Sequence, residues 1–289
     1  MPELPEVETV KRGLLKLIVG KSIKSVSSDN PKSFPNAQSD VNIFLINASV
    51  IDVRRRAKVL LIDLSTSYTL VVHLKMTGQL VFINNIERFG AGHPNDSLVG
   101  HLPDKSTRVI FEFNDKSHLY FNDQRKFGWV RLMPTVEVPN IDFMKKVGPE
   151  PLEDSFTVDN FISRFSRRPR TNIKAAILDQ SVIAGVGNIY ADESLWGAMI
   201  HPRRLVGSIT DLEFKSLYNE VRTVMNLSIE KGGSTNRNYV NAEGKKGSYM
   251  DFARVFRREG QECPRCGAEI VKIRVAGRGT HICPVCQQE

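Results

Sequence analysis

Apolar and polar positions follow two different periods along the chain. In residues 5–19 the apolar side chains recur with the spacing of a helix that buries one face. Pro5 and Glu6 stand at its start and Gly20 follows its end, which are typical helix boundary signals. Residues 22–133 instead show short apolar runs separated by turn residues. We expect strands at Val59–Leu64, Thr69–Leu74, Gln79–Ile83, Arg108–Phe113, Ser117–Phe121 and Trp129–Leu132.

The helical period returns in the second half of the chain. Residues 157–230 have a helical pattern, and the last of these helices is expected to end at Gly232-Gly233. Two segments predict loops by composition, 86–106 as a long loop or insertion and 234–250 as a polar, mobile loop. Together the patterns predict an α+β protein in which one helix precedes a β-sandwich and a helical domain follows. We place the boundaries at 1–134 for the sandwich domain, 135–151 for a linker, 152–250 for the helical domain and 251–289 for a C-terminal hairpin.

The composition adds a bias in charge to this picture. The chain has 289 residues, of which 41% are hydrophobic, so it can build two packed domains. Its formal net charge is +8 and its isoelectric point is near 9.3, which suits a polyanionic partner such as nucleic acid. A basic surface without a partner would give the same numbers. We do not expect the acidic, proline-containing N-terminus to be a signal peptide, and no apolar run is long enough to predict a membrane span.

The cysteines occupy one short segment. All four lie in two Cys-x2-Cys pairs separated by 16 residues. Two such pairs can place four thiolates around one Zn²⁺, and four sulfur ligands leave no open coordination position. The sequence therefore predicts one structural zinc ion and no disulfide framework. The ligands would be Cys263, Cys266, Cys283 and Cys286.

Two further features permit either a functional or a plain structural interpretation. Arg278 lies between glycines in the hairpin, where an arginine can meet a phosphate or can simply occupy an exposed turn. Pro2 would become a free secondary amine after removal of Met1, and such an amine can attack a sugar carbon. Glu3 and Glu6 beside it can shuttle protons, or can merely cap a helix.

Five segments and the cysteine hairpin together resemble the formamidopyrimidine-DNA glycosylases. The resemblance extends over essentially the whole chain, and the segments occur in the same order as in that family. It implies a β-sandwich domain, a helical domain with a helix–two-turns–helix element, and duplex DNA between them. The segments are PELPEVETV (2–10), RRAKVLL (55–61), HLKMTG (73–78), DQRKFG (123–128) and AGVGNIYADE (184–193).

The resemblance also implies a chemistry. Pro2 would attack C1′ of the damaged nucleotide and expel the base, and Glu3 would handle protons at the sugar and the leaving base. Glu6 would help to set the site. Lys58 would reach the phosphate and the damaged base, although a solvent-facing strand lysine is its plain interpretation. The protein would then be a bifunctional glycosylase and abasic-site lyase of base excision repair.

Six further residues would contact the DNA by resemblance. Met76 and Phe127 would enter the duplex as apolar wedges, and Arg125 would face the orphaned base, because chemistry on a base requires its removal from the stack. Periodicity alone would assign Met76 and Phe127 to the core. His73, Asn188 and Arg278 would join Lys58 in holding the backbone of the lesion strand. His73 could equally be a half-buried strand histidine.

These implications favour one function over two others. We expect a monomeric bacterial cytoplasmic enzyme, nucleoid-associated when acting, that excises oxidised purines from double-stranded DNA. An endonuclease VIII-type glycosylase would use the same proline on oxidised pyrimidines, but Met76, Arg125 and Phe127 match the purine-specific branch. The remaining alternative is a zinc-ribbon DNA-binding protein without activity.

Overall fold

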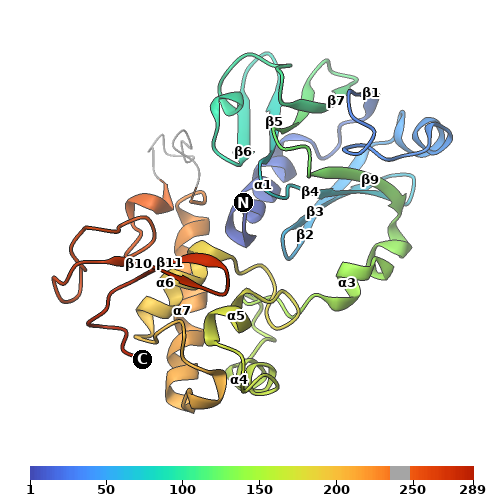
Figure 1. The fold of residues 1–289 in the computed structure, drawn as a ribbon. Coiled ribbons are helices and arrows are strands. Elements are labelled where there is room, and N and C mark those ends of the chain that lie inside the picture. The colour runs from blue at the N-terminus through green and yellow to red at the C-terminus, as the bar shows by residue number, and fades with distance from the viewer. Residues whose placement is uncertain (235–247) are drawn as a thin grey trace. The chain divides into compact units, whose positions relative to one another are not determined.

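The computed structural model describes residues 1–234 and 248–289. The chain divides into two compact units, one formed by Met1–Lys145 with Gly232–Gly247 and the other by Lys146–Lys231 with Ser248–Glu289. Figure 1 shows strands dominating the first unit and helices the second. The α+β class is confirmed. Most of segment 234–250, where the sequence predicts a loop, lies outside the described residues.

The first unit is a β-sandwich preceded by a helix. Within the described residues, one sheet has the strand order β1-β7-β8-β5-β6 and the other has the order β2-β3-β4-β9. All their strand pairs are antiparallel. The strands are β1 (Ile23–Ser28), β2 (Val50–Arg56), β3 (Val59–Leu64), β4 (Tyr68–His73), β5 (Gly78–Ile83), β6 (Arg88–Gly92), β7 (Thr107–Phe113), β8 (His118–Asp123) and β9 (Trp129–Pro134).

Helix α1 (Leu4–Leu17) completes the core of this unit. Val7, Val10 and Leu14 are fully buried and share one cluster with apolar residues of both sheets. Short helical segments also occur between the strands and after the last one. They are α2 (Gln38–Asp40), the π-helix η1 (Val41–Leu45), and the 3-10 helices η2 (Asp96–Leu98) and η3 (Thr135–Asn140), followed by α3 (Asp142–Lys146).

Three strands of this unit were not predicted. The predicted loop 86–106 is wrong at its start, where Arg88–Gly92 forms edge strand β6 against β5. Strands β1 and β2 were missed because most of their side chains are polar or partly exposed and give little apolar alternation. The six strands that were predicted all exist, with boundaries shifted by two residues at most.

The second unit contains the predicted helices. α7 begins with a capping box formed by Thr210 and Glu213, in which the Glu213 carboxylate accepts the Thr210 N–H at 2.8 Å. The connection 179–187 between α5 and α6 consists of turns and corresponds to a helix–two-turns–helix element. The helices are α4 (Val158–Ser166), α5 (Ile173–Leu178), α6 (Asn188–Gly197), η4 (Val206–Ser208), α7 (Asp211–Glu230) and η5 (Tyr249–Asp251).

The C-terminal hairpin belongs to this second unit. Strands β10 (Val271–Val275) and β11 (Arg278–Ile282) pair antiparallel, and β11 packs beside α6 (Figure 1). Trp196 of α6 shares a small apolar cluster with Cys263 and Cys283. In the described part of the chain, no helix combines the length and the hydrophobicity that crossing a bilayer requires.

Candidate functional site

The N-terminal residues are buried where α1 begins. Pro2 is buried, and Glu3 is only 3% exposed. Glu6 accepts the backbone N–H of Glu3 on Oε2 at 2.7 Å. Its Oε1 accepts the backbone N–H of Ser234 at 2.8 Å and the Ser234 hydroxyl at 2.9 Å. Because both of its oxygens accept hydrogen bonds, Glu6 fixes the backbone next to Pro2 and joins it to Ser234.

The close approach of Ser234 depends on the glycine before it. Gly233 has φ +90°, in the left-handed region that side chains disfavour. A Cβ there would also lie 3.3 Å from Cγ and Oε1 of Glu6. The sequence identified this glycine pair only as the end of a helix. Its second role, positioning Ser234 against Glu6, depends on a contact across 228 residues.

Lys58 lies in the tight turn between β2 and β3, where Ala57 has φ 53°. Lys58 is 8% exposed, so it is not the solvent-facing strand lysine of the plain interpretation. Arg55 donates one hydrogen bond to Ala57 O at 3.0 Å and another to Glu8 Oε2 at 2.9 Å. Glu8 is on α1, so this ion pair connects the Lys58 turn to the helix that follows Pro2.

The ion pair between Glu8 of α1 and Arg55 of β2 changes the pKa of Glu8. Burial alone would raise the pKa of Glu8, but the hydrogen bond and charge of Arg55 outweigh burial and lower that pKa. Arg12 and Lys11 on the same helix act in the same direction. Glu8 therefore remains an anionic partner for Arg55 at neutral pH.

His73 ends β4 and lies opposite Val59 in the β3–β4 register, next to the Lys58 turn. Its ring is half-buried near Trp129 and Phe143, with centroid distances of 5.8 and 6.3 Å. Burial and the charges of Lys75 and Lys58 lower its pKa to about 3. Nδ1 accepts the Lys75 N–H at 3.1 Å, so the neutral ring carries its proton on Nε2. His73 is thus a half-buried histidine that can donate one neutral hydrogen bond.

A single buried aspartate holds the two turns that carry Met76 and Arg125. Asp123 is 0% exposed and pairs with Gly78 across β8 and β5. Its Oδ1 accepts the Thr77 hydroxyl and, at 3.2 Å, the Arg125 N–H. Its Oδ2 accepts the Gly128 N–H at 2.6 Å. Both turns therefore share one carboxylate anchor.

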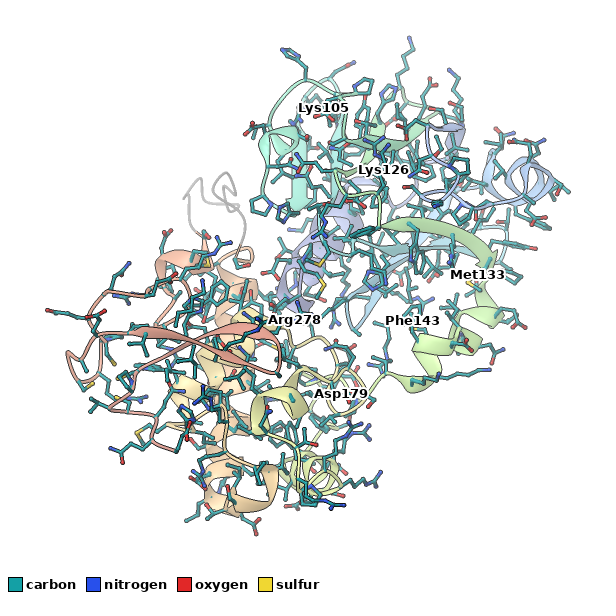
Figure 2. All side chains as sticks on the ribbon, in the orientation of Figure 1. Lys105, Lys126, Met133, Phe143, Asp179 and Arg278 are labelled. Carbon is teal, nitrogen blue, oxygen red and sulfur yellow. The ribbon has the colours of Figure 1, made fainter. Side chains whose placement is uncertain are left out.

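The side chains at these turns differ in exposure. Phe127 is 54% exposed and the Arg125 guanidinium lies 4.9 Å above the centre of its ring. The Asp123 anchor therefore presents a cation and an aromatic ring together at one exposed tip, on which Lys126 is also visible (Figure 2). Met76 is half-buried. Phe127 is not the core residue that its apolar character alone would suggest.

Asn188 and Arg278 are close together in the second unit. Asn188 is the first residue of α6, and its side-chain Nδ2 donates to Gly279 O at 3.0 Å. Arg278 begins β11 after the two-residue turn Ala276-Gly277, whose φ angles are 49° and 73°. These angles fit the tight hairpin turns that match strand twist. Arg278 is exposed at this tip (Figure 2).

The four cysteines converge at the opposite end of the hairpin. All four sulfur atoms lie within 4.8 Å of one another, with 3.9 Å between Cys263 and Cys286 and 3.4 Å between Cys266 and Cys283. A tetrahedral zinc site with Zn–S bonds of about 2.3 Å has sulfur–sulfur edges of about 3.8 Å. The cluster therefore fits one zinc ion. Because all four ligands are sulfur, the ion is structural.

The predicted site residues divide between the two units. Asn188, Arg278 and the cysteines belong to the second unit, and the other predicted residues belong to the first. Sequence reasoning missed several residues that hold the predicted site residues in place. These are Glu8, Asp123 and Ser234, together with Lys174 and Asp192, which contact each other and the residues after Arg278. Glu8, Asp123 and Asp192 lie inside the segments quoted for the resemblance, but nothing in the sequence indicated their partners.

Three family models match the chain. The formamidopyrimidine-DNA glycosylase N-terminal domain matches residues 1–130, and the H2TH domain of the same family matches residues 147–240. A zinc finger found in FPG and IleRS matches residues 260–288.

Individual proteins match over the whole chain. Formamidopyrimidine-DNA glycosylase of Pelotomaculum thermopropionicum is 41% identical over 289 residues, covering 100% of this chain and 99% of that protein. The wild-type Lactococcus lactis Fpg in complex with a DNA containing N7-benzyl-Fapy-dG has a TM-score of 0.86 and 34% identity, with full coverage of both chains. The same enzyme with a DNA containing an oxidised pyrimidine has a TM-score of 0.85, 34% identity and the same coverage.

Proposed function

The chain belongs to the formamidopyrimidine-DNA glycosylase family, and we propose that this DNA glycosylase of base excision repair uses Pro2 as its nucleophile and then cuts the strand. The observation that carries the proposal is the buried N-terminus. Pro2 and Glu3 are enclosed at the start of α1, and Glu6 holds the peptide N–H that follows Pro2. A nucleophilic amine needs such a fixed position to act on a bound sugar.

The reaction begins after removal of Met1 frees the Pro2 nitrogen. That nitrogen attacks C1′, the bond from C1′ to the base breaks, and the base leaves with a proton. Glu3 moves protons at the sugar ring and at the leaving base. The C1′–O4′ bond then breaks as O4′ takes a proton from Glu3, so the sugar ring opens. The product is an iminium between Pro2 and C1′, which makes the neighbouring sugar protons acidic. Loss of these protons expels the 3′ and then the 5′ phosphate, leaving a one-nucleotide gap.

Lys58 and His73 are neighbours in the structure and would act on the same stretch of backbone. Lys58 supplies a positive charge from a turn that Arg55 and Glu8 connect to α1. His73 supplies a neutral donor. Asn188 and Arg278 hold the backbone of the lesion strand from the second unit. Asn188 would do so with the N-terminus of α6, since its amide side chain donates to Gly279 O.

The substrate is double-stranded DNA containing an oxidised purine. Phe127 and Met76 would fill the gap left by the flipped nucleotide, and Arg125 would face the orphaned base. A relative bound to a formamidopyrimidine-type lesion supports this preference. Another complex of the same relative contains an oxidised pyrimidine. The purine preference and the endonuclease VIII-type alternative therefore differ in the relative rates at which oxidised purines and oxidised pyrimidines would be excised. Duplexes with 8-oxoguanine, formamidopyrimidines and oxidised pyrimidines would rank the lesions.

The wider proposal places this chemistry in a monomer of the bacterial cytoplasm, acting at the nucleoid. Residues 1–134 would be the catalytic domain and 152–250 the DNA-binding domain, joined by linker 135–151. The hairpin 251–289 would complete the grip on DNA. The bacterial sources of the relatives support the compartment.

Borohydride trapping tests the mechanism. Reduction of the iminium on abasic duplex DNA should give a covalent adduct, and peptide mass spectrometry should locate it on Pro2. A chain that retains Met1 or carries an N-terminal tag should bind DNA but form no adduct. Lys58→Gln serves as the control, because it removes the primary amine of the other predicted catalytic residue and should still be trapped. An adduct on Lys58, or full activity of the tagged chain, would refute the proposal, and a non-catalytic protein would not be trapped at all.

A further inference from the structure

A lysine with no exposed surface lies behind the Arg278 tip. Lys174 of α5 is 0% exposed, although lysine is among the side chains least often buried. Its Nζ lies 2.6 Å from Oδ1 of Asp192 on α6 and donates to the Thr280 hydroxyl of β11, also at 2.6 Å. A longer contact of 3.5 Å reaches Gly279 O. One ammonium group thus joins three elements of the second unit.

Asp192 extends the same contact to the next residue of the strand. Its Oδ2 accepts the backbone N–H of His281 at 2.9 Å and lies 3.1 Å from Nδ1 of the His281 ring. The Lys174–Asp192 pair therefore contacts Gly279, Thr280 and His281, the three residues that directly follow Arg278. Asn188 holds the same stretch through Gly279 O.

Stability is a weak explanation for this arrangement. Removing two charges from water is costly, and apolar pairs of similar volume often replace a buried ion pair without loss of stability. What an apolar pair cannot supply is the set of directed hydrogen bonds to Thr280 and His281. The buried pair therefore specifies where this strand lies against α5 and α6.

The zinc ion fixes the other end of the hairpin. Arg278 is five residues before Cys283, which corresponds to roughly 16 Å along an extended strand at about 3.3 Å per residue. The metal determines the fold of the cysteine end, but a two-stranded ribbon can still bend and twist over that length. Lys174 and Asp192 act directly at the arginine end.

We propose that Lys174 is a positioning residue which, together with Asp192, fixes the Arg278 tip so that the guanidinium meets a backbone phosphate of bound DNA. The inference rests on the proposed function, because it takes phosphate as the partner of Arg278. Loss of the Lys174 ammonium frees the first residues of β11 to move. Arg278 then contributes no more to DNA binding than an alanine would at that position.

The test measures binding to an uncleavable duplex with an abasic-site analogue as a function of salt, using the zinc-loaded full chain. Arg278→Ala should flatten the slope of log affinity against log salt by about one unit, since one phosphate contact is lost. Lys174→Met should flatten it by a similar amount. The double variant should be no flatter than either single variant, because both changes remove the same contact.

Two further variants make the result decisive. Lys174→Met/Asp192→Leu leaves no unpaired buried charge, so it should remain folded and should show the same flattened slope. Lys215→Met removes an exposed lysine of α7 and should keep the wild-type slope. Hydrogen exchange should show faster exchange in the peptide 276–282 of the Lys174 variants and unchanged exchange in α7.

The outcomes separate the two proposals. An unchanged slope in Arg278→Ala would refute the phosphate role of Arg278, and the positioning role with it. A normal Arg278 effect combined with a wild-type slope in both Lys174 variants would refute the positioning role alone. Fully additive effects of Lys174→Met and Arg278→Ala would do the same, because two independent contacts would then be lost.

Discussion

Two exposed tips, one in each unit, are held by buried aspartates in different ways. Asp123 lies behind the Arg125–Phe127 tip and is 0% exposed, while Asp192 lies behind the Arg278 tip and is 1% exposed. Asp123 accepts hydrogen bonds from two backbone N–H groups and a threonine hydroxyl. Asp192 forms a buried ion pair with Lys174 and accepts a backbone N–H.

The difference lies in how each carboxylate is compensated. The partners of Asp123 named above are dipoles, which come from turns that the strands already hold close together. Asp192 faces a full positive charge from another helix, and that charge must be compensated as well. A change at Asp123 therefore affects one anion and its donors, whereas a change at Asp192 also leaves a buried cation. The two tips should respond unequally to equivalent perturbations.

Removing zinc should produce the largest difference between the two tips. Chelation or Cys263→Ser takes away metal-ligand free energy that is coupled to folding of the hairpin. The Arg278 tip should lose its structure, and affinity for duplex DNA should fall by about a hundredfold or more. Zinc analysis and binding titrations would measure both effects. The Arg125–Phe127 tip should keep its hydrogen-exchange protection, and equal loss of protection in both units would contradict this separation.

Neutralising the two aspartates compares the anchors directly. Asp192→Asn leaves Lys174 charged and buried, which should lower the free energy of unfolding of the second unit by about 3–5 kcal/mol. Asp123→Asn keeps a side-chain oxygen that can still accept from a turn, so it should cost only about 1–3 kcal/mol in the first unit.

The two tryptophans make this comparison measurable. Trp129 is in the first unit and Trp196 in the second, and the chain has no others. Urea unfolding of each aspartate variant, with the other tryptophan changed to phenylalanine, follows one unit at a time. Equal destabilisation by the two substitutions would show that the ion pair with Lys174 does not make the second unit more sensitive to neutralisation of its aspartate.

Sequence patterns predicted the scaffold better than the anchors. Strand Val59–Leu64 was predicted with its observed boundaries because a compact apolar run is bounded by turn signals. The four cysteines were sufficient to predict the metal site, because they lie close together in the sequence. Both predictions depend only on residues that are near one another in the sequence.

The anchors could not be predicted because their partners are distant. Thr77 and Asp123 are 46 residues apart, and Lys174 and Thr280 are 106 residues apart. A lysine or an aspartate in an amphipathic segment is normally expected at the surface. Only the tertiary structure shows that these side chains are buried. Phe127 shows the opposite case. Its apolar character predicts burial, but its place in a turn leaves the ring exposed.

The first unit should also respond to pH through His73. The pKa of this imidazole is about 3 in the folded protein and about 6.5 in an unfolded chain. Above pH 6.5 the ring is neutral in both states, whereas between pH 6.5 and 3 only the unfolded chain binds the proton. The free energy of unfolding should therefore fall as the pH falls, by about 2 kcal/mol from pH 7 to pH 5.

A matched pair of variants checks this pH dependence. His73→Phe keeps an aromatic ring beside Trp129 and Phe143, and should remove most of that fall. His101→Phe changes an exposed histidine of the same unit and should retain it. Urea unfolding followed by Trp129 fluorescence in a Trp196→Phe background isolates the first unit. An identical pH dependence in the two variants would show that the buried ring of His73 does not cause it.

The smallest expected difference concerns salt. Arg278 is a permanent cation, so its contact with a phosphate releases counterions, and Arg278→Ala should flatten the salt slope by about one unit. His73 donates a neutral hydrogen bond near pH 7, because its pKa is about 3. His73→Ala should therefore weaken DNA binding by a similar factor at every salt concentration and leave the slope unchanged. Fluorescence anisotropy from 50 to 200 mM salt resolves the contrast, since one unit of slope is roughly a fourfold change in affinity over that range. A flattened slope for His73→Ala at pH 7 would mean that the ring is charged when DNA is bound. In that case lowering the pH to 6 should tighten binding of the wild-type chain more than that of the variant, which the neutral ring does not predict.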